Sequence, residues 1–325
     1  MEKALRKECN RQGTALLIYK MIMNVAVTVV MIGGAIGYLL EQMIHGQEDV
    51  NILMDGFVES LLQGAGSGWG YILAIAIGVM ALLLWKKPSF FRHEILKRGR
   101  PMGAGSFLTI LCLFMGAQLV SQIGIKLMDG ILGVFGKSMT QYLEAASVDT
   151  GNFSMWLYAG LGAPIFEEVL FRGLMMRSLE PYGKRMSILV SALLFGFFHG
   201  NPVQAPYAAL VGLVLGYVAM EYNIIWAMVL HMFNNLIFAD TIPRLLQNLP
   251  VNFQNAVVIG LLVVFALTAA ILLIVKRRQV LTYLKEDRIQ PWQYNGAFLS
   301  PVLLVLVAVC VMDMVAFIGM ILITP

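Results

Sequence analysis

Long apolar stretches separated by short polar segments follow one another along most of the chain. A helix that crosses a bilayer needs about 20 mostly apolar residues. By this criterion the pattern predicts about eight or nine membrane spans. The nine candidate spans are residues 15–40, 70–85, 106–135, 154–179, 185–200, 205–221, 224–239, 256–275 and 297–323. The pattern therefore predicts an all-α, polytopic transmembrane helical bundle.

Basic residues are concentrated in alternate loops between these spans. Four lie in residues 1–14, six in 86–105 and five in 276–296, whereas 41–69 has none. Because Lys and Arg are enriched in cytoplasmic loops, we expect a cytoplasmic N-terminus and a C-terminus on the opposite side. The spans divide into an N-terminal region (1–150, about three spans), a core (151–240) and a C-terminal region (241–325, two spans).

Composition supports a membrane protein and narrows its partners. The chain is 59% hydrophobic and 13% charged, whereas soluble domains are about 45–50% apolar and about 25% charged. The net charge of +4 is modest, and the basic residues of the chain cluster in loops, where they indicate membrane topology. We therefore expect no nucleic-acid partner. The three cysteines form no CxxC pair, so neither a disulfide framework nor a thiolate metal site is predicted.

Two adjacent glutamates, Glu167 and Glu168, lie in an apolar stretch with Arg172 close behind. An intramembrane carboxylate is a candidate functional group because burying its charge in lipid is costly. Glu168 and Arg172 are four residues apart and can pair on one helix face. Glu167 lies about 100° further around a regular helix. We therefore expect Arg172 to neutralise Glu168 and to leave Glu167 facing elsewhere.

Two more polar clusters fall at membrane depth. One is Phe195-Gly-Phe-Phe-His199 and the other is His231-Met-Phe-Asn-Asn235. With a rise of about 1.5 Å per residue, Glu167 and His199 lie equally far from the turn that joins their helices, and Asn235 reaches a similar depth. The spacing predicts that these groups converge within the membrane.

This set of residue types suits the hydrolysis of an amide bond. Glu167 can take a proton from water, and His199 can orient the water or the base. His231 and Asn235 can donate hydrogen bonds to a developing oxyanion. Because no convincing Ser or Cys nucleophile lies at helical spacing from a base, a water nucleophile is preferred.

Other interpretations stay open at this point. Glu167, His199 and His231 can also ligate Zn²⁺ with one open position, although the HExxH spacing is absent and no cofactor is otherwise expected. Carboxylates and histidines at mid-depth also describe a proton relay in a transporter or channel. Taken alone, the pair of Glu168 with Arg172 is more typical of structural stabilisation than of catalysis.

The three clusters resemble the motifs of a known family. Glu167-Glu168-Val-Leu-Phe-Arg172 is similar to the EExxxR motif of the CPBP family, the CAAX prenyl protease and bacteriocin-processing (Abi) group of intramembrane endopeptidases. Residues 195–199 look like its FxxxH motif, and residues 231–235 look like its HxxxN/D motif. The resemblance covers about residues 150–240.

The resemblance implies an intramembrane endopeptidase in which Glu167 is the base that activates water, assisted by His199. It assigns His231 and Asn235 to the oxyanion and makes residues of the first two motifs supporting ones, namely Glu168, Arg172 and Phe195. It implies a peptide or membrane-protein substrate in a lipid bilayer, which we expect to be a bacterial plasma membrane. It also leaves open metal dependence and a non-catalytic role, as in bacteriocin immunity.

Overall fold

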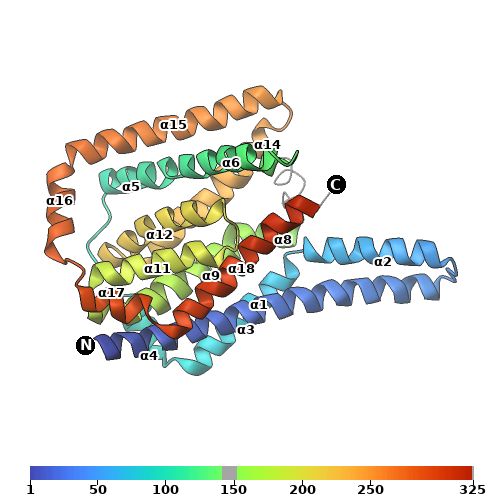
Figure 1. Cartoon of the computed structure of the whole chain (residues 1–325), viewed down its shortest axis with the longest axis horizontal. Helices are drawn as coiled ribbons and strands as arrows, with labels where there is room; N and C mark the ends of the chain where they lie inside the picture. Colours follow the sequence, from blue (N-terminus) through green and yellow to red (C-terminus); the bar gives the residue numbers. More distant parts are fainter. Residues whose placement is uncertain (141–151, 324–325) are drawn as a thin grey trace. The chain divides into compact units, whose positions relative to one another are not determined.

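The protein is described by a computed structural model that covers residues 1–140 and 152–323 (Figure 1). The structure is 85% helical, and the described residues contain no β-strand. The prediction of an all-α helical bundle is therefore confirmed. The helices of the protein form from long runs of apolar residues, because such runs must satisfy their backbone hydrogen bonds internally in a membrane.

Among the described residues, five helical segments are long and apolar enough to cross a membrane, or six if the bent pair α2 (Val50–Ala65) and α3 (Trp69–Trp85) is one span. The five segments are α1 (Glu2–Ile44), α5 with α6 (Ala104–Gly116 and Gln118–Gly133), α13 with η5 and α14 (Ile224–Phe233, Asn234–Thr241 and Ile242–Leu246), α15 (Val251–Val275) and α18 (Pro301–Ile323). The count of eight or nine spans stays a prediction.

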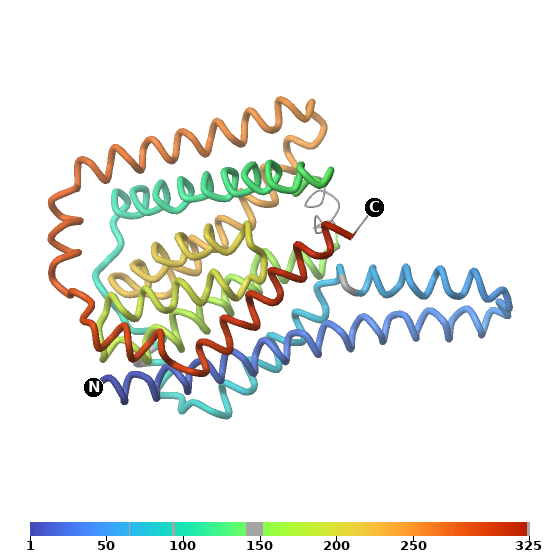
Figure 2. The backbone as a smooth tube through the Cα atoms, in the orientation of Figure 1, coloured from blue at the N-terminus to red at the C-terminus, as the bar shows by residue number. Residues whose placement is uncertain are grey.

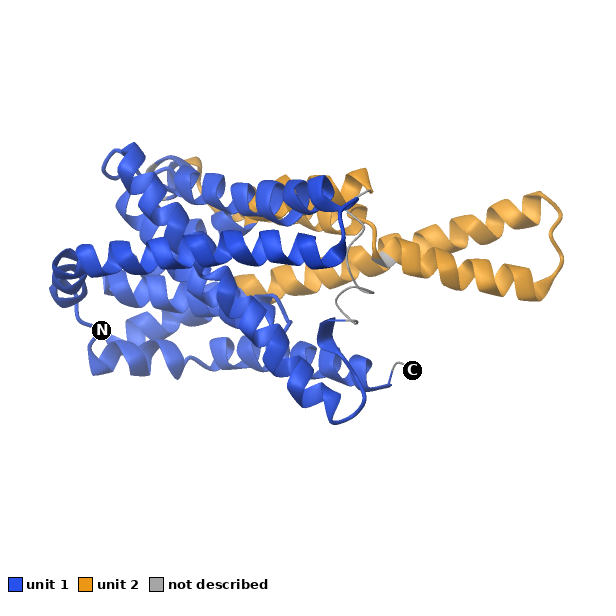
Figure 3. Ribbon diagram, turned by 90° about the horizontal axis from the view of Figure 1, so that it is seen from above, with its two compact units in different colours: residues 1–14, 89–147, 167–325 blue, residues 15–88, 148–166 orange. Residues whose placement is uncertain are grey.

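Contacts divide the chain into two compact units, which Figure 3 colours separately. Unit 1 consists of residues 1–14, 89–147 and 167–325, and unit 2 consists of residues 15–88 and 148–166. These units cross the boundaries of the three regions that we expected from the sequence, so that division stays a prediction. All the predicted site residues belong to unit 1.

Within unit 2, α3 packs against the segment formed by α8 (Phe153–Leu157) and the π-helix η2 (Tyr158–Gly162). The rings of Tyr71 and Tyr158 stack with centroids 4.6 Å apart, and the Gly68 N–H donates to Ser154 Oγ at 3.1 Å. The turn between α2 and α3 thus lies against the residues that lead into the first motif.

The core of unit 1 is built on α11 (Lys184–Phe198) and α12 (Gln204–Glu221), which pack side by side (Figure 2). Gly196 permits this close approach, because a Cβ there would lie 2.6 Å from the carbonyl oxygen of Ala205. Buried apolar residues of α12, α13 and α5 complete the core. The remaining short elements are α4 (Pro88–Phe90), η1 (Phe91–Ile95), η4 (Glu180–Tyr182), α16 (Arg277–Glu286) and α17 (Pro291–Phe298).

The segment that carries the first motif is less regular than we expected. Instead of one α-helix over 154–179, it alternates between α-helical and π-helical turns. After α8 and η2 come α9 (Ala163–Glu168), the π-helix η3 (Val169–Met176) and α10 (Arg177–Leu179). Ser191 Oγ donates to the carbonyl oxygen of Phe171 at 2.8 Å, which satisfies a buried group in the widened turn. Such π-turns occur frequently at functional sites.

Candidate active site

The centre of the site is the carboxylate of Glu168, whose side chain is fully buried. Glu168 Oε1 accepts a hydrogen bond from Arg172 Nη1 at 3.0 Å and lies 3.0 Å from His231 Nδ1. The pairing of Glu168 with Arg172, predicted from their four-residue spacing, is confirmed. The contact with His231, a residue of the third motif, was not predicted.

Arg172 is held in place from two further sides. Its Nη2 donates to the carbonyl oxygen of Gly212 at 3.2 Å, and its Cζ lies 4.3 Å from the centre of the Phe195 ring. Arg172 is fully buried, so its charge depends on these partners and on Glu168. The guanidinium thereby ties the first motif to α11 and α12.

Glu167 lies on the other side of the same imidazole. Its Oε2 is 3.8 Å from His231 Nε2, which is too long for a direct hydrogen bond. Our expectation that Glu167 faces away from the Glu168 pair is therefore wrong in one respect, since the two carboxylates flank one ring. The two nitrogens of an imidazole lie on different edges of the ring, so adjacent residues can each reach one. Glu167 keeps 23% of its side-chain surface exposed, whereas Glu168 keeps none.

His199 lies where α11 ends. Its Nδ1 is 2.7 Å from the carbonyl oxygen of Phe195, and because a carbonyl oxygen only accepts, Nδ1 carries the proton. In the neutral ring Nε2 is then the acceptor. Gly200 follows with φ 62°, a conformation that favours glycine and stops the helix directly after His199.

Phe195 packs between the two histidines. Its ring lies edge-on to His199 and to His231, with centroids 4.9 and 5.7 Å apart. Phe171 lies edge-on to Phe195 at 5.2 Å. The phenylalanine of the second motif therefore contacts both imidazoles, and its supporting role stays a prediction.

Asn235, the last residue of the third motif, is positioned by neighbours that our sequence reasoning missed. Asn234 Nδ2 donates to Asn235 Oδ1 at 2.9 Å. Asn234 Oδ1 in turn accepts from Gln118 Nε2 and from the Tyr207 hydroxyl, the latter at 3.3 Å. Two donors at this oxygen fix which way the Asn234 amide points. The only sequence signal was the doubled asparagine at 234 and 235.

The alternative metal site does not fit this arrangement. Within residues 1–140 and 152–323, no group of three or more His, Cys, Asp and Glu side chains can hold a metal ion, including Glu167, His199 and His231. His231 also directs Nδ1 to Glu168. We therefore derive no step through a metal.

Four side chains thus form one connected array, which we call the glutamate–histidine cluster: Glu167, His231, Glu168 and Arg172. It joins residues of the first and third motifs, and Phe195 and His199 of the second motif pack beside it. The array combines a partly exposed carboxylate, an oriented imidazole and a buried ion pair. This equipment suits proton transfer to or from a bound molecule.

The same segment matches a known family. Residues 149–237 match the family model for type II CAAX prenyl endopeptidase, Rce1-like. Residues 149–237 are thus similar to this family, and we call them the Rce1-like segment. The match confirms the resemblance to the CPBP family over about a quarter of the chain and covers all three motifs. No curated protein and no solved structure shows significant similarity to the chain.

The family match supports the assignment to CAAX-type intramembrane endopeptidases at the level of the family, and such an enzyme is a protease. Together with the apolar helices, it indicates a multi-pass membrane protein that acts on a peptide substrate.

Proposed function

We propose that the protein hydrolyses peptide bonds of a membrane-associated or peptide substrate by attack of a water molecule that Glu167 activates. Glu167 takes a proton from the water molecule while the oxygen of that water attacks the scissile carbonyl carbon. The resulting tetrahedral oxyanion collapses, the C–N bond breaks, and Glu167 returns the proton to the leaving amine. We place this activity in a bacterial plasma membrane.

One observation carries the choice of Glu167 over its neighbour. Glu168 is fully buried and paired with Arg172, whereas Glu167 is partly exposed and lies 3.8 Å from His231. A base must reach both its proton and a bound substrate. Glu167 meets this requirement and Glu168 does not.

The remaining residues take supporting and electrostatic roles. Neutral His199 presents Nε2 as an acceptor, which suits the orientation of a water beside Glu167. His231 and Asn235 face the developing oxyanion as hydrogen-bond donors. In that role His231 carries a proton on each nitrogen, one directed to Glu168 and one to the oxyanion. Arg172 and Glu168 fix the position of His231 without contacting substrate.

A proton relay is the second candidate, because carboxylates and an imidazole do form a connected array here. The array ends, however, at Arg172, whose guanidinium stays charged in proteins and is fully buried. A relay across the membrane needs groups that release protons at both ends. This observation favours the protease.

The test is a comparison of peptides released by cells that carry the wild type or Glu167→Gln. The substitution keeps the side-chain shape and removes the base, so we expect the products to disappear while the protein level stays unchanged. Glu59→Gln is the matched control, since Glu59 is exposed on α2. Normal products from Glu167→Gln would refute the assignment. Proton uptake lost in that variant, without any product in the wild type, would establish the relay instead.

A further inference from the structure

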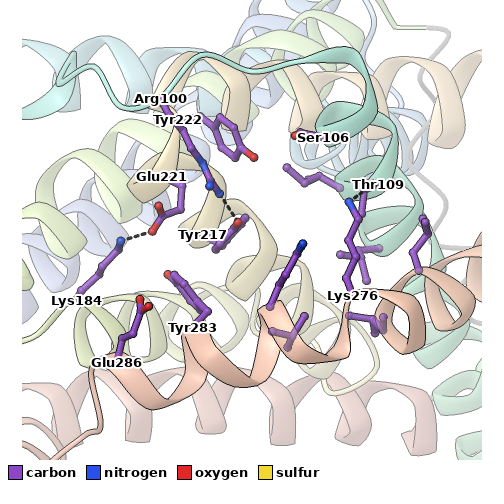
Figure 4. A pocket seen from close by; sticks show the side chains of 16 residues that line it. Arg100, Ser106, Thr109, Lys184, Tyr217, Glu221, Tyr222, Lys276, Tyr283 and Glu286 are labelled. Carbon is purple, nitrogen blue, oxygen red and sulfur yellow. Dashed lines mark hydrogen bonds and ion pairs between the residues drawn. The ribbon is translucent and has the colours of Figure 1, made fainter.

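A cavity of about 740 Å³ lies in unit 1, away from the glutamate–histidine cluster. It opens between α5, the end of α12, the end of α15 and α16, and none of the residues of the three motifs lines it. We call it the basic pocket. Figure 4 shows Arg100, Lys184 and Lys276 reaching into it from different elements.

The basic residues of this pocket come from three separate segments. Arg100 lies in the loop before α5, Lys184 begins α11, and Lys276 joins α15 to α16. Each of these segments is a basic one that the positive-inside rule places on the cytoplasmic side. Their meeting in one cavity is consistent with that orientation and places the mouth of the pocket at the cytoplasmic surface of the membrane.

Two of the three cations donate side-chain hydrogen bonds to neutral hydroxyl groups. Arg100 Nη2 donates to the Tyr217 hydroxyl at 2.5 Å, and its Cζ lies 4.6 Å from the centre of the Tyr222 ring. Lys276 Nζ donates to Thr109 Oγ1 at 3.2 Å. In the part of the chain that the structure describes, neither cation forms a salt bridge. Both charges are therefore available to an anion.

The two acidic residues of the pocket do not cancel this charge. Glu221, which acts on Arg100 electrostatically, is itself paired with Lys184. Glu286 is exposed on α16, where water solvates it. Tyr283 adds a phenol whose pKa is raised by burial and by the Glu221 carboxylate, so it keeps its proton and stays a donor. The pocket thus offers two cations and neutral donors.

The inner wall of the pocket is apolar. Ile110 and Leu113 of α5 face it from one side, and Leu272 and Val280 face it from the other. The helices α5 and α15 pack along each other in this region. A ligand that fits both parts needs an anionic head at the cytoplasmic surface and a hydrocarbon part that runs into the membrane.

We propose that the basic pocket binds the phosphate headgroup of an anionic phospholipid, with one acyl chain against Ile110, Leu113 and Leu272. Arg100 and Lys276 contact the phosphate oxygens, and Tyr217 stays hydrogen-bonded to Arg100. This proposal is independent of the proteolytic activity, because no residue of the three motifs takes part.

The test measures lipid retained by the purified full-length chain in nanodiscs that contain phosphatidylglycerol and phosphatidylcholine. The variant Arg100→Gln with Lys276→Gln removes both phosphate contacts. Its control is Arg98→Gln with Arg278→Gln, which removes the same charge at exposed positions nearby that do not line the pocket. We expect the pocket variant to lose at least about tenfold in retention of phosphatidylglycerol, and the control to lose little.

Two further measurements keep the test decisive. Leu272→Trp fills the apolar wall without changing charge, and we expect it also to reduce retention. Arg100→Lys with Lys276→Arg keeps both charges, so we expect retention close to that of the wild type. An equal loss in pocket and control variants would show general surface attraction and overturn the proposal, as would retention unchanged in all variants. Displacement of the lipid by millimolar inorganic phosphate would instead assign the pocket to a soluble anion.

Discussion

The glutamate–histidine cluster and the basic pocket both gather charged residues from distant parts of unit 1, but they hold those charges differently. In the cluster, Glu168 and Arg172 are fully buried and satisfy each other. In the pocket, Arg100 is exposed and bonded to a phenol. Each charge of a buried pair is stabilised by the other charge, whereas charges at the rim of a pocket are stabilised by solvent or by a ligand. The cluster thus holds its charges in a buried array that satisfies itself, whereas the pocket leaves its cations open to solvent or a ligand.

The sharpest way to break this comparison is to remove the buried guanidinium. Arg172→Leu leaves the Glu168 carboxylate buried without its cation, so we expect the free energy of unfolding to fall by about 3–5 kcal/mol. Thermal unfolding in detergent measures the change. Arg11→Leu is the control, because it breaks an exposed ion pair with Glu8 and is expected to cost less than about 1 kcal/mol. Equal losses in the two variants would contradict the contrast between buried and exposed charges.

Glu168→Gln tests whether the buried carboxylate also positions His231. The amide keeps the shape but loses two charge-assisted hydrogen bonds, so we expect kcat to fall by about 10- to 100-fold. KM should change little, because the Glu168 side chain is fully buried and out of reach of a substrate. A raised KM with unchanged kcat would instead point to a role in substrate binding.

Asn234→Ala removes the side chain that positions Asn235. Of the hydrogen bonds that it removes, the neutral one to Asn235 is worth about 1 kcal/mol, so we expect kcat to fall about five- to tenfold. Asn255→Ala is the control, since Asn255 is exposed on α15. If both variants cleave at the wild-type rate, the network of Gln118, Tyr207 and Asn234 has no part in catalysis.

The smallest effect is expected at the edge of the basic pocket. Lys184→Gln removes the ion pair with Glu221, and both side chains keep contact with solvent. We expect a change of no more than about 1 kcal/mol in the free energy of unfolding, and one that salt weakens. A loss of several kcal/mol in the free energy of unfolding would show that the Lys184–Glu221 pair stabilises the fold as strongly as the buried Glu168–Arg172 pair. It would contradict the distinction between exposed and buried charges.

The sequence predicted local features of the site well. Helical spacing identified the pairing of Glu168 with Arg172, because residues four apart share a face whatever the rest of the fold does. The first and third motifs also contain the residues that form the glutamate–histidine cluster. The all-α architecture followed from the apolar runs, which leave no other way to satisfy the backbone in lipid.

Other features depend on contacts that spacing does not contain. His231 and Glu168 are 63 residues apart in the sequence. The position of the His231 imidazole between the two glutamates therefore depends on how α13 packs, which the sequence did not reveal. The π-turns of η3 and η5 change the register on which a regular helical period relies. Gln118 lies outside the motifs, and nothing in its local sequence marks it as a partner of Asn234. The basic pocket likewise combines several basic loops. The charge pattern predicted that these loops lie on one side of the membrane, but it could not predict that they meet in one cavity.

The central claim is that Glu167 is the base of a proteolytic site. Its most direct test is the cleavage rate of an identified peptide substrate by purified wild type and Glu167→Gln, both reconstituted in nanodiscs and matched for thermal stability. The account predicts that the glutamine variant is slower by at least about 100-fold, as expected when general base catalysis is removed. A rate within a few fold of the wild type would contradict it.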